Sequence, residues 1–141
     1  MTNFAVFMAG NAMKEDTVEV LVSKRFMEKG NPVPWKVKAL DSEKDEAIRK
    51  DCTKRVPIPG KRGQFNQETD TDKYIARMCV ACTVFPDLNN AELQDSYGVK
   101  SADALLKKML LPGEYTEYKA RVMEINGYDM SMDELVEEAK N

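Results

Sequence analysis

Hydrophobic and polar residues alternate in two neighbouring segments near the start of the chain. Between residues 17 and 26 the valines and the phenylalanine fall at even positions, and between residues 33 and 40 the hydrophobic face falls at odd positions. A period of two residues is typical of a strand with one buried face. A Gly-Asn pair between the segments favours a turn. The pattern predicts a β-hairpin over residues 17–40, and we expect Trp35 to dock it onto the rest of the protein.

From residue 41 onward the hydrophobic residues recur about every 3.6 positions, which is the period of an α-helix. Asp41 or Ser42 can cap the first helical segment, Ser101 can cap a later one, and Pro112 can begin another. The segments with helical spacing are 42–54, 71–85, 89–98, 102–111, 114–126 and 131–140. This spacing predicts about five short helices joined by short connections.

Two other segments have no clear period. Residues 1–16 could hold a short helix that starts at Asn3 and breaks near Gly10. Residues 56–70 contain two prolines and two glycines within a few positions, which predicts an exposed loop without regular structure. The whole chain, residues 1–141, is therefore expected to form one α+β domain that is mostly helical, with the N-terminal hairpin packed on the helices.

Composition narrows the functional classes. The chain has 43% hydrophobic and 32% charged residues, and its apolar runs fall short of the ~20 residues that span a bilayer. We therefore expect a protein of the cytoplasm with no membrane partner. A net charge of −3 and a pI of about 5.1 argue against nucleic-acid binding. The absence of histidine removes the commonest general base and metal ligand, and no catalytic motif occurs, so we expect neither an enzyme nor a cofactor.

The three cysteines are the sharpest candidates for chemistry. Cys79 and Cys82 form a Cys-x-x-Cys pair, and Cys52 is the third thiol. Such a pair can bind zinc or exchange disulfides, but zinc needs four ligands, and a redox pair usually sits at a helix N-terminus. Here the pair lies inside a predicted helix, so packing in the core is favoured. A small thiol or metal-binding protein is kept as the alternative function.

Charge is unevenly distributed along the chain. Residues 49–62 carry six basic side chains and one acidic one, whereas residues 114–140 carry eight acidic and three basic side chains. Each segment is expected to be solvated. The basic segment could also contact an acidic partner, and pairing of the two segments between subunits could support a homo-oligomer.

Leucine, methionine and tyrosine are concentrated between residues 93 and 118. Tyrosine can bury its ring while its hydroxyl stays in water, which suits a binding surface. The residues predicted to bind a partner or a neighbouring subunit are Tyr97, Leu110, Leu111, Tyr115 and Tyr118. Completion of the core is an equally good interpretation of these five. Met8, Met13 and Met27 are further candidates for a partner surface.

Several segments together resemble one protein family. ELQDSYGV at residues 92–99 and LLKKMLLPGEY at residues 105–115 are the most specific, and similar segments run in the same order from about residue 17 to the end. They resemble the XkdN-like tail assembly chaperones, which are encoded by tailed phages and prophages of Gram-positive bacteria. The Cys-x-x-Cys pair is not associated with that family.

The resemblance implies a non-enzymatic role in building a phage tail. Members of the family are thought to bind the long tape measure protein, keep it soluble, and help the tail tube protein polymerise around it. They act in the cytoplasm of the bacterial host and are not expected in the mature virion. A structural tail component remains a further alternative.

Overall fold

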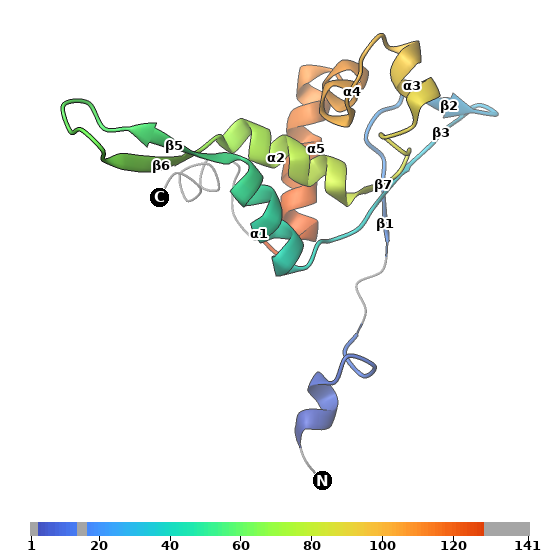
Figure 1. Ribbon diagram of the computed structural model, residues 1–141. Helices are drawn as coiled ribbons and strands as arrows, with labels where there is room; N and C mark the ends of the chain where they lie inside the picture. The colour runs from blue at the N-terminus through green and yellow to red at the C-terminus, as the bar shows by residue number, and fades with distance from the viewer. Residues whose placement is uncertain (1–2, 14–16, 129–141) are drawn as a thin grey trace.

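The computed structural model of the chain describes residues 3–13 and 17–128 (Figure 1). Its strands are β1 (Val18–Val20), β2 (Met27–Glu28), β3 (Asn31–Pro32), β4 (Trp35–Val37), β5 (Thr53–Pro57), β6 (Phe65–Thr69) and β7 (Thr83–Phe85). Its helices are the short 3-10 helix η1 (Asn3–Phe7) and the α-helices α1 (Ser42–Asp51), α2 (Thr71–Cys82), α3 (Ala91–Ser96), α4 (Ala102–Met109) and α5 (Pro112–Ile125). The expected α+β class is confirmed.

The N-terminal β-hairpin is present as the sequence predicted. Strand β1 runs antiparallel to β4, with Val20 opposite Trp35 and Val18 opposite Val37. The short strands β2 and β3 close the turn, where Gly30 has a φ of 83° that favours glycine. The aligned valines and the tryptophan turn one face of the hairpin towards the helices.

A third strand, β7, completes this sheet in the order β1-β4-β7 and was not predicted. The expected helix over 71–85 is wrong in its last turn, because α2 ends at Cys82 and the next three residues form the strand. Lys38 donates its backbone N–H to the Cys82 carbonyl over 2.9 Å, so the free edge of β4 continues the pairing. A run of apolar residues fits a buried helix face or a strand equally well, and the available edge decided between them.

Most of residues 56–70 are exposed, as expected, but the prediction that they lack regular structure is wrong. Strands β5 and β6 pair in continuous register from Thr53 opposite Thr69 to Pro57 opposite Phe65. This two-stranded hairpin, residues 53–69, is called the arm, and it projects from the helices in Figure 1. Cys52 and Thr53 leave α1 and form the base of the arm. Helix α1 therefore ends at Asp51, and the expected end at residue 54 is wrong.

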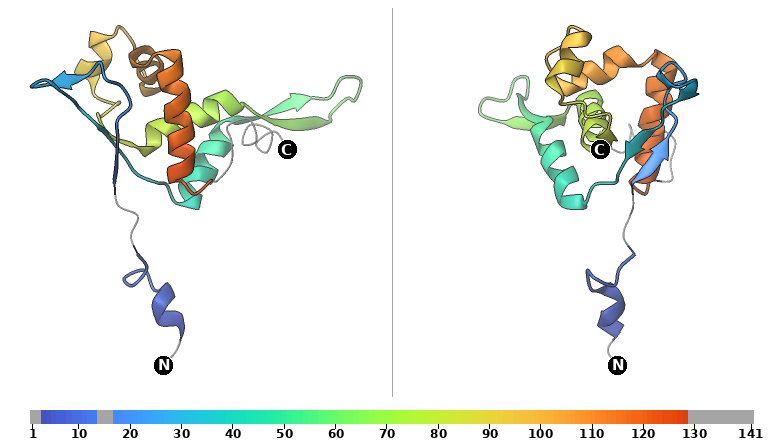
Figure 2. Two further views of the ribbon diagram at one scale, coloured as in Figure 1. Left: turned by 180° about the vertical axis from the view of Figure 1, so that it is seen from behind. Right: turned by 90° about the vertical axis from the view of Figure 1, so that its right-hand side faces the viewer.

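The core lies between the sheet and the helices. Helix α2 crosses α5 and also packs against α1 and α4 (Figures 1 and 2). Trp35 is 2% exposed, and its ring meets the Tyr118 ring edge-on at 5.2 Å between centres, which confirms that Trp35 docks the hairpin. The fully buried aliphatic and sulfur-containing side chains around these rings include Val37, Met78, Cys79, Cys82, Leu88, Leu105, Leu106 and Val122.

Local capping fixes several helix ends where the sequence placed them. The Asp41 side chain accepts from the Lys44 N–H over 2.8 Å, and the Ser101 hydroxyl accepts from the Ala104 N–H over 3.2 Å. Helix α5 begins at Pro112. The helix predicted for residues 131–140 lies outside the described residues.

Candidate partner-binding surface

One carboxylate fastens the N-terminal hairpin to the start of α5. Glu114 Oε1 accepts from Arg25 Nη2 over 2.7 Å and from the Leu111 N–H over 2.8 Å. The same Arg25 nitrogen donates to the Met109 carbonyl over 2.6 Å. The hydrogen bond from Arg25, with others from Ser23 and the Leu111 backbone, lowers the pKa of Glu114 to about 2. We call this contact the Arg25–Glu114 latch, and it fixes the turn between α4 and α5.

The five residues predicted to bind a partner are spread over this turn and its flanks at different depths. Tyr118 is 2% and Leu110 is 6% exposed, so both belong to the core of this chain. Tyr97 and Tyr115 are half-buried. Leu111, directly at the latch, is 55% exposed. Of the five residues, the structure thus leaves Leu111 about half exposed, keeps part of Tyr97 and Tyr115 accessible, and buries Leu110 and Tyr118.

Hydrogen bonding explains why Tyr118 points inward. Its hydroxyl bonds to the Thr83 hydroxyl, which in turn donates to the Cys79 carbonyl over 2.6 Å. Burial raises the pKa of Tyr118, so the phenol stays protonated. The half-buried Tyr115 carries the ammonium group of Lys119 4.4 Å from its ring centre, and its pKa is raised by burial to about 12. Both phenols are therefore uncharged at neutral pH, and only the half-buried Tyr115 offers part of its ring to a partner.

Other exposed apolar side chains lie on the sheet and were missed by sequence reasoning. Leu21 follows β1 and is 52% exposed, while Val84 and Phe85 on β7 are 51% and 47% exposed. Val84 and Phe85 fall in the segment 71–85 that was expected to be one helix, so the strand that exposes them was not foreseen. Strand β7 pairs with β4 along one side, and its other side is an unpaired edge within the described residues. Unpaired edges and exposed apolar side chains are common places for another chain to bind.

The N-terminal segment carries a second group of exposed apolar residues. The members are Phe4 at 73%, Val6 at 65%, Phe7 at 78%, Met8 at 61% and Met13 at 97% exposure. Met27 in the hairpin turn is 53% exposed. All three methionines that the sequence suggested for a partner surface are therefore accessible.

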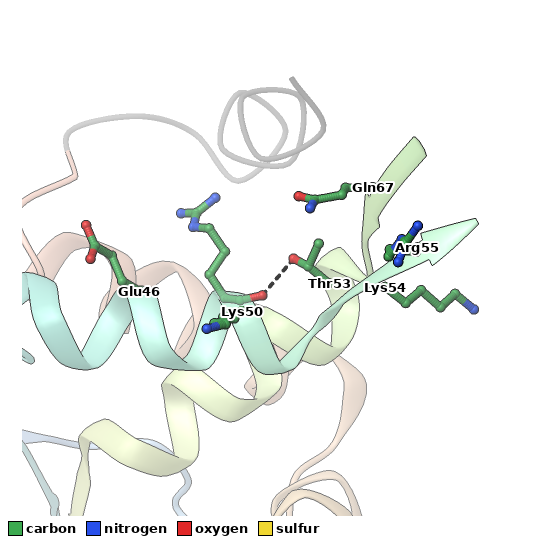
Figure 3. A pocket seen from close by; sticks show the side chains of 7 residues that line it. Glu46, Lys50, Thr53, Lys54, Arg55 and Gln67 are labelled. Carbon is green, nitrogen blue, oxygen red and sulfur yellow. Dashed lines mark hydrogen bonds between the residues drawn. The ribbon is translucent and has the colours of Figure 1, made fainter. Parts of the chain in front are cut away.

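A basic pocket of about 420 Å³ lies on another part of the molecule, between α1 and the base of the arm (Figure 3). Four basic side chains line it, Arg49, Lys50, Lys54 and Arg55, together with the single acid Glu46. The structure thus gathers four of the six bases of the segment 49–62 here, and the remaining two lie in the turn of the arm. Such a pocket can bind carboxylates.

Arg49 is held in this pocket by an aromatic ring. Its guanidinium lies 4.5 Å from the Tyr74 ring centre, and Nη2 donates to the Tyr74 hydroxyl over 3.1 Å. The Tyr74 hydroxyl donates to Asp45, whose other carboxylate oxygen lies 3.9 Å from Arg49. Arg49 is thus a fixed wall of the pocket.

The cysteines pack as core residues. Cys79 and Cys82 are 0% and 1% exposed, and Cys52 is 4% exposed. Burial raises the pKa of Cys79 to about 12 and also raises the pKa of Cys82, whose sulfur accepts from Asn126 Nδ2 over 3.3 Å. Metal binding and disulfide exchange need a thiolate, which such pKa values suppress at neutral pH. The buried environment therefore disfavours the thiol or metal-binding alternative.

The described residues hold neither a cluster of metal-binding side chains nor a membrane-spanning helix. Residues 3–13 and 17–128 contain no group of three or more Cys, Asp or Glu side chains placed to hold a metal ion. No helix in this part of the chain has the length and apolar character needed to cross a bilayer.

Comparisons with protein families, with known sequences and with solved structures agree over nearly the whole chain. Residues 4–140 match the family described as phage XkdN-like tail assembly chaperone protein. Two Bacillus subtilis (strain 168) proteins are similar in alignments that cover 99% of this chain. The uncharacterized protein YqbN is 35% identical, with 93% of its length covered, and the phage-like element PBSX protein XkdN is 30% identical, with 94% covered. The crystal structure of YqbN aligns with a TM-score of 0.76 and 29% identity over 92% of this chain and 99% of that one.

Proposed function

Because the chain belongs to the phage XkdN-like tail assembly chaperone family, we propose that it binds the tape measure protein of its own phage or prophage and keeps that protein soluble while the tail tube is built. The tail tube protein would be a second partner. The chain would work without catalysing a reaction, in the cytoplasm of the bacterial host, and would be absent from the mature virion. The family match over residues 4–140 is the observation that carries this proposal.

Exposed apolar side chains support a binding role. A chaperone that holds an amphipathic helix needs accessible apolar groups on a body that stays folded and charged. Leu111, Leu21 and Phe85 are each about half exposed, next to elements anchored by the latch and by Trp35. The net charge of −3 would help to keep the complex in solution.

The surface around Leu111 is the proposed contact for the tape measure protein. Leu111 would insert between apolar residues of the partner, with Tyr97 and Tyr115 at its sides. Tyr118 and Leu110 would act from beneath, since their burial fixes the backbone that presents Leu111. The latch would hold this backbone in place before the partner arrives, which reduces the entropic cost of binding.

Co-expression with the tape measure protein from the same gene cluster tests the proposal. We expect the tape measure protein to remain in the soluble fraction with this chain and to aggregate without it. Leu111→Asp should reduce the soluble fraction, because a buried carboxylate would replace an apolar contact. Phe65→Asp is the matched control, since Phe65 is 45% exposed but lies on the arm. Equal aggregation with and without the chain would contradict the proposal.

Mass spectrometry of purified particles tests the alternative role of a structural tail component. We expect the tail tube and tape measure proteins in those particles and no peptides of this chain. Recovery of the chain in stoichiometric amounts would assign it to the finished tail.

A further inference from the structure

The basic pocket has more positive charge than the described part of the chain neutralises. Arg49 faces Asp45 at 3.9 Å, but no described carboxylate lies within ion-pair distance of Lys50, Lys54 or Arg55. These three side chains belong to exposed residues at the end of α1 and the start of β5. The pocket is therefore open to a ligand that carries several carboxylates.

The described chain ends beside the start of α1, the helix that forms one wall of this pocket. Tyr128, the last described residue, packs on the core. Asn126 Oδ1, two residues earlier, accepts from the Leu40 N–H over 2.9 Å, just before α1 begins. The residues that follow Tyr128 thus leave the core on the side of α1, whose later residues line the basic pocket.

Those following residues, 129–141, carry the complementary charge. Five of the 13 are acidic, Asp129, Asp133, Glu134, Glu137 and Glu138, and Lys140 is the one basic residue. The last four of these acids are spaced so that a helix would present them on one side. Thirteen residues reach about 20 Å as a helix and about 45 Å when extended, so length does not prevent contact with the neighbouring pocket.

We propose that the acidic C-terminal segment of this chain, residues 129–141, docks on the basic pocket formed by Lys50, Lys54 and Arg55. Attachment at Tyr128 favours the segment of the same chain, because a short tether gives an effective concentration on the order of millimolar. The contact weakens with added salt, since exposed charges are screened. An acidic segment of any other protein has to displace residues 129–141 to enter the pocket.

Carbodiimide cross-linking of the full chain tests the docking directly, because the reagent joins lysine amines to carboxylates in contact. The probe is an equal mixture of ordinary and nitrogen-15-labelled chains, analysed by mass spectrometry. We expect links from Lys50 or Lys54 to residues 129–141 within one chain, fewer at high salt, and few from Lys61. Links confined to differently labelled chains would place the segment on a second copy and overturn the proposal, as would the absence of links to Lys50 and Lys54.

Charge reversal gives an independent measurement on the full chain. Lys54→Glu with Arg55→Glu should lower the protection of amides 129–141 against hydrogen exchange by about tenfold, as expected for loss of a few exposed ion pairs. Lys61→Glu with Arg62→Glu is the matched control, because it changes the net charge equally but lies in the turn of the arm. Trp35 fluorescence checks that both variants fold. Equal protection in all three proteins would overturn the proposal.

Discussion

The described residues of the protein include two β-hairpins that differ in their relation to the core. The N-terminal hairpin buries Trp35 and Val37 against the helices, with exposed fractions of 2% and 0%. The arm buries no side chain completely, and residues 59 to 68 are all exposed. A two-stranded hairpin is marginal in water by itself, so each must draw stability from elsewhere. The N-terminal hairpin is stabilised by burial against the helices. The arm is stabilised by hydrogen bonds at its base and by contacts between its two strands.

The contacts of the arm are local. The hydroxyls of Thr53 and Thr69 hydrogen bond across its base at 2.8 Å, and the Arg55 guanidinium lies 4.2 Å from the Phe65 ring centre. The Asp70 N–H donates to the Cys52 carbonyl over 2.8 Å and closes the pair of strands. Regular β-structure therefore does not require a buried face if both ends of the pairing are anchored. We therefore expect the arm to open without unfolding the core, and the N-terminal hairpin to open only when the core unfolds.

The largest expected difference between the hairpins comes from their aromatic residues. Trp35→Ala should lower the free energy of unfolding by about 3–5 kcal/mol, because it removes a buried ring and leaves a cavity. Phe65→Ala on the arm should change it by about 1 kcal/mol or less. The free energies of unfolding of the two variants are compared by urea unfolding followed by far-ultraviolet circular dichroism. This signal does not depend on the emission of Trp35, which one variant lacks. Similar losses in the two variants would contradict the division between buried and exposed hairpins.

A second prediction concerns the polar clamp at the end of the N-terminal hairpin. Asn126 Oδ1 accepts from the Leu40 N–H over 2.9 Å, and its amide donates to the Val122 carbonyl over 2.8 Å and to Cys82. Asn126→Ala should cost about 1–3 kcal/mol, because partly buried groups lose their partners. The exposed Asn66→Ala on the arm is the control, expected within about 0.5 kcal/mol. Equal urea midpoints for the two variants would show that the clamp adds nothing.

The latch gives the N-terminal hairpin a pH dependence that the arm should lack. The pKa of Glu114, about 2, lies below its value of about 4.3 in an unfolded chain, so ionised Glu114 favours the folded state. This contribution is present above pH ~4.5 and is lost as the pH falls towards 2. Glu114→Gln should therefore lower the urea midpoint at pH 7 and differ less from the unmodified chain at pH 3. Glu68→Gln is the matched control, because it removes the same charge from the exposed arm, away from the latch.

The smallest expected effect is confined to the arm. Arg55→Ala removes the cation–π contact with Phe65, which is worth about 0.5–1 kcal/mol at an exposed site. Amides of β5 and β6 should exchange faster in this variant, and those of α2 and α5 should keep their rates. Hydrogen exchange read by mass spectrometry separates the two sets. Faster exchange in α2 would mean that the arm and the core unfold as one unit.

Sequence reasoning found the first hairpin and missed the second for a physical reason. Alternation between Val18 and Val37 marks a buried face, and that pattern is written in the hydrophobicity of the residues. The arm has almost no apolar alternation, and its prolines and glycines indicated a loop. Its pairing depends on where α1 ends and α2 begins, which brings Thr53 and Thr69 together. A pattern of hydrophobic residues in the sequence cannot reveal two paired strands that bury few apolar side chains.

The candidate binding surface was foreseen in the same uneven way. Leu111 was named and is exposed, while Tyr118 and Leu110 were named and are buried. Phe85 was assigned to a helix and lies on the edge strand β7. Helical periodicity gives the direction of a side chain within its own element, but depth depends on the neighbouring elements. The pattern around the Pro112 turn therefore located the region but could not rank the residues within it.

The sequence by itself determined the features that depend on neighbouring residues: the N-terminal hairpin, the caps at Asp41 and Ser101, the start of α5 at Pro112, and the family resemblance. Only the tertiary structure decided that residues 83–85 join the sheet, that Glu114 meets Arg25, and that the bases of α1 and β5 share a pocket. Each of these depends on free strand edges, charges or helix ends that lie far apart in the chain. Such contacts form only when the packing of the core has set the distances between elements.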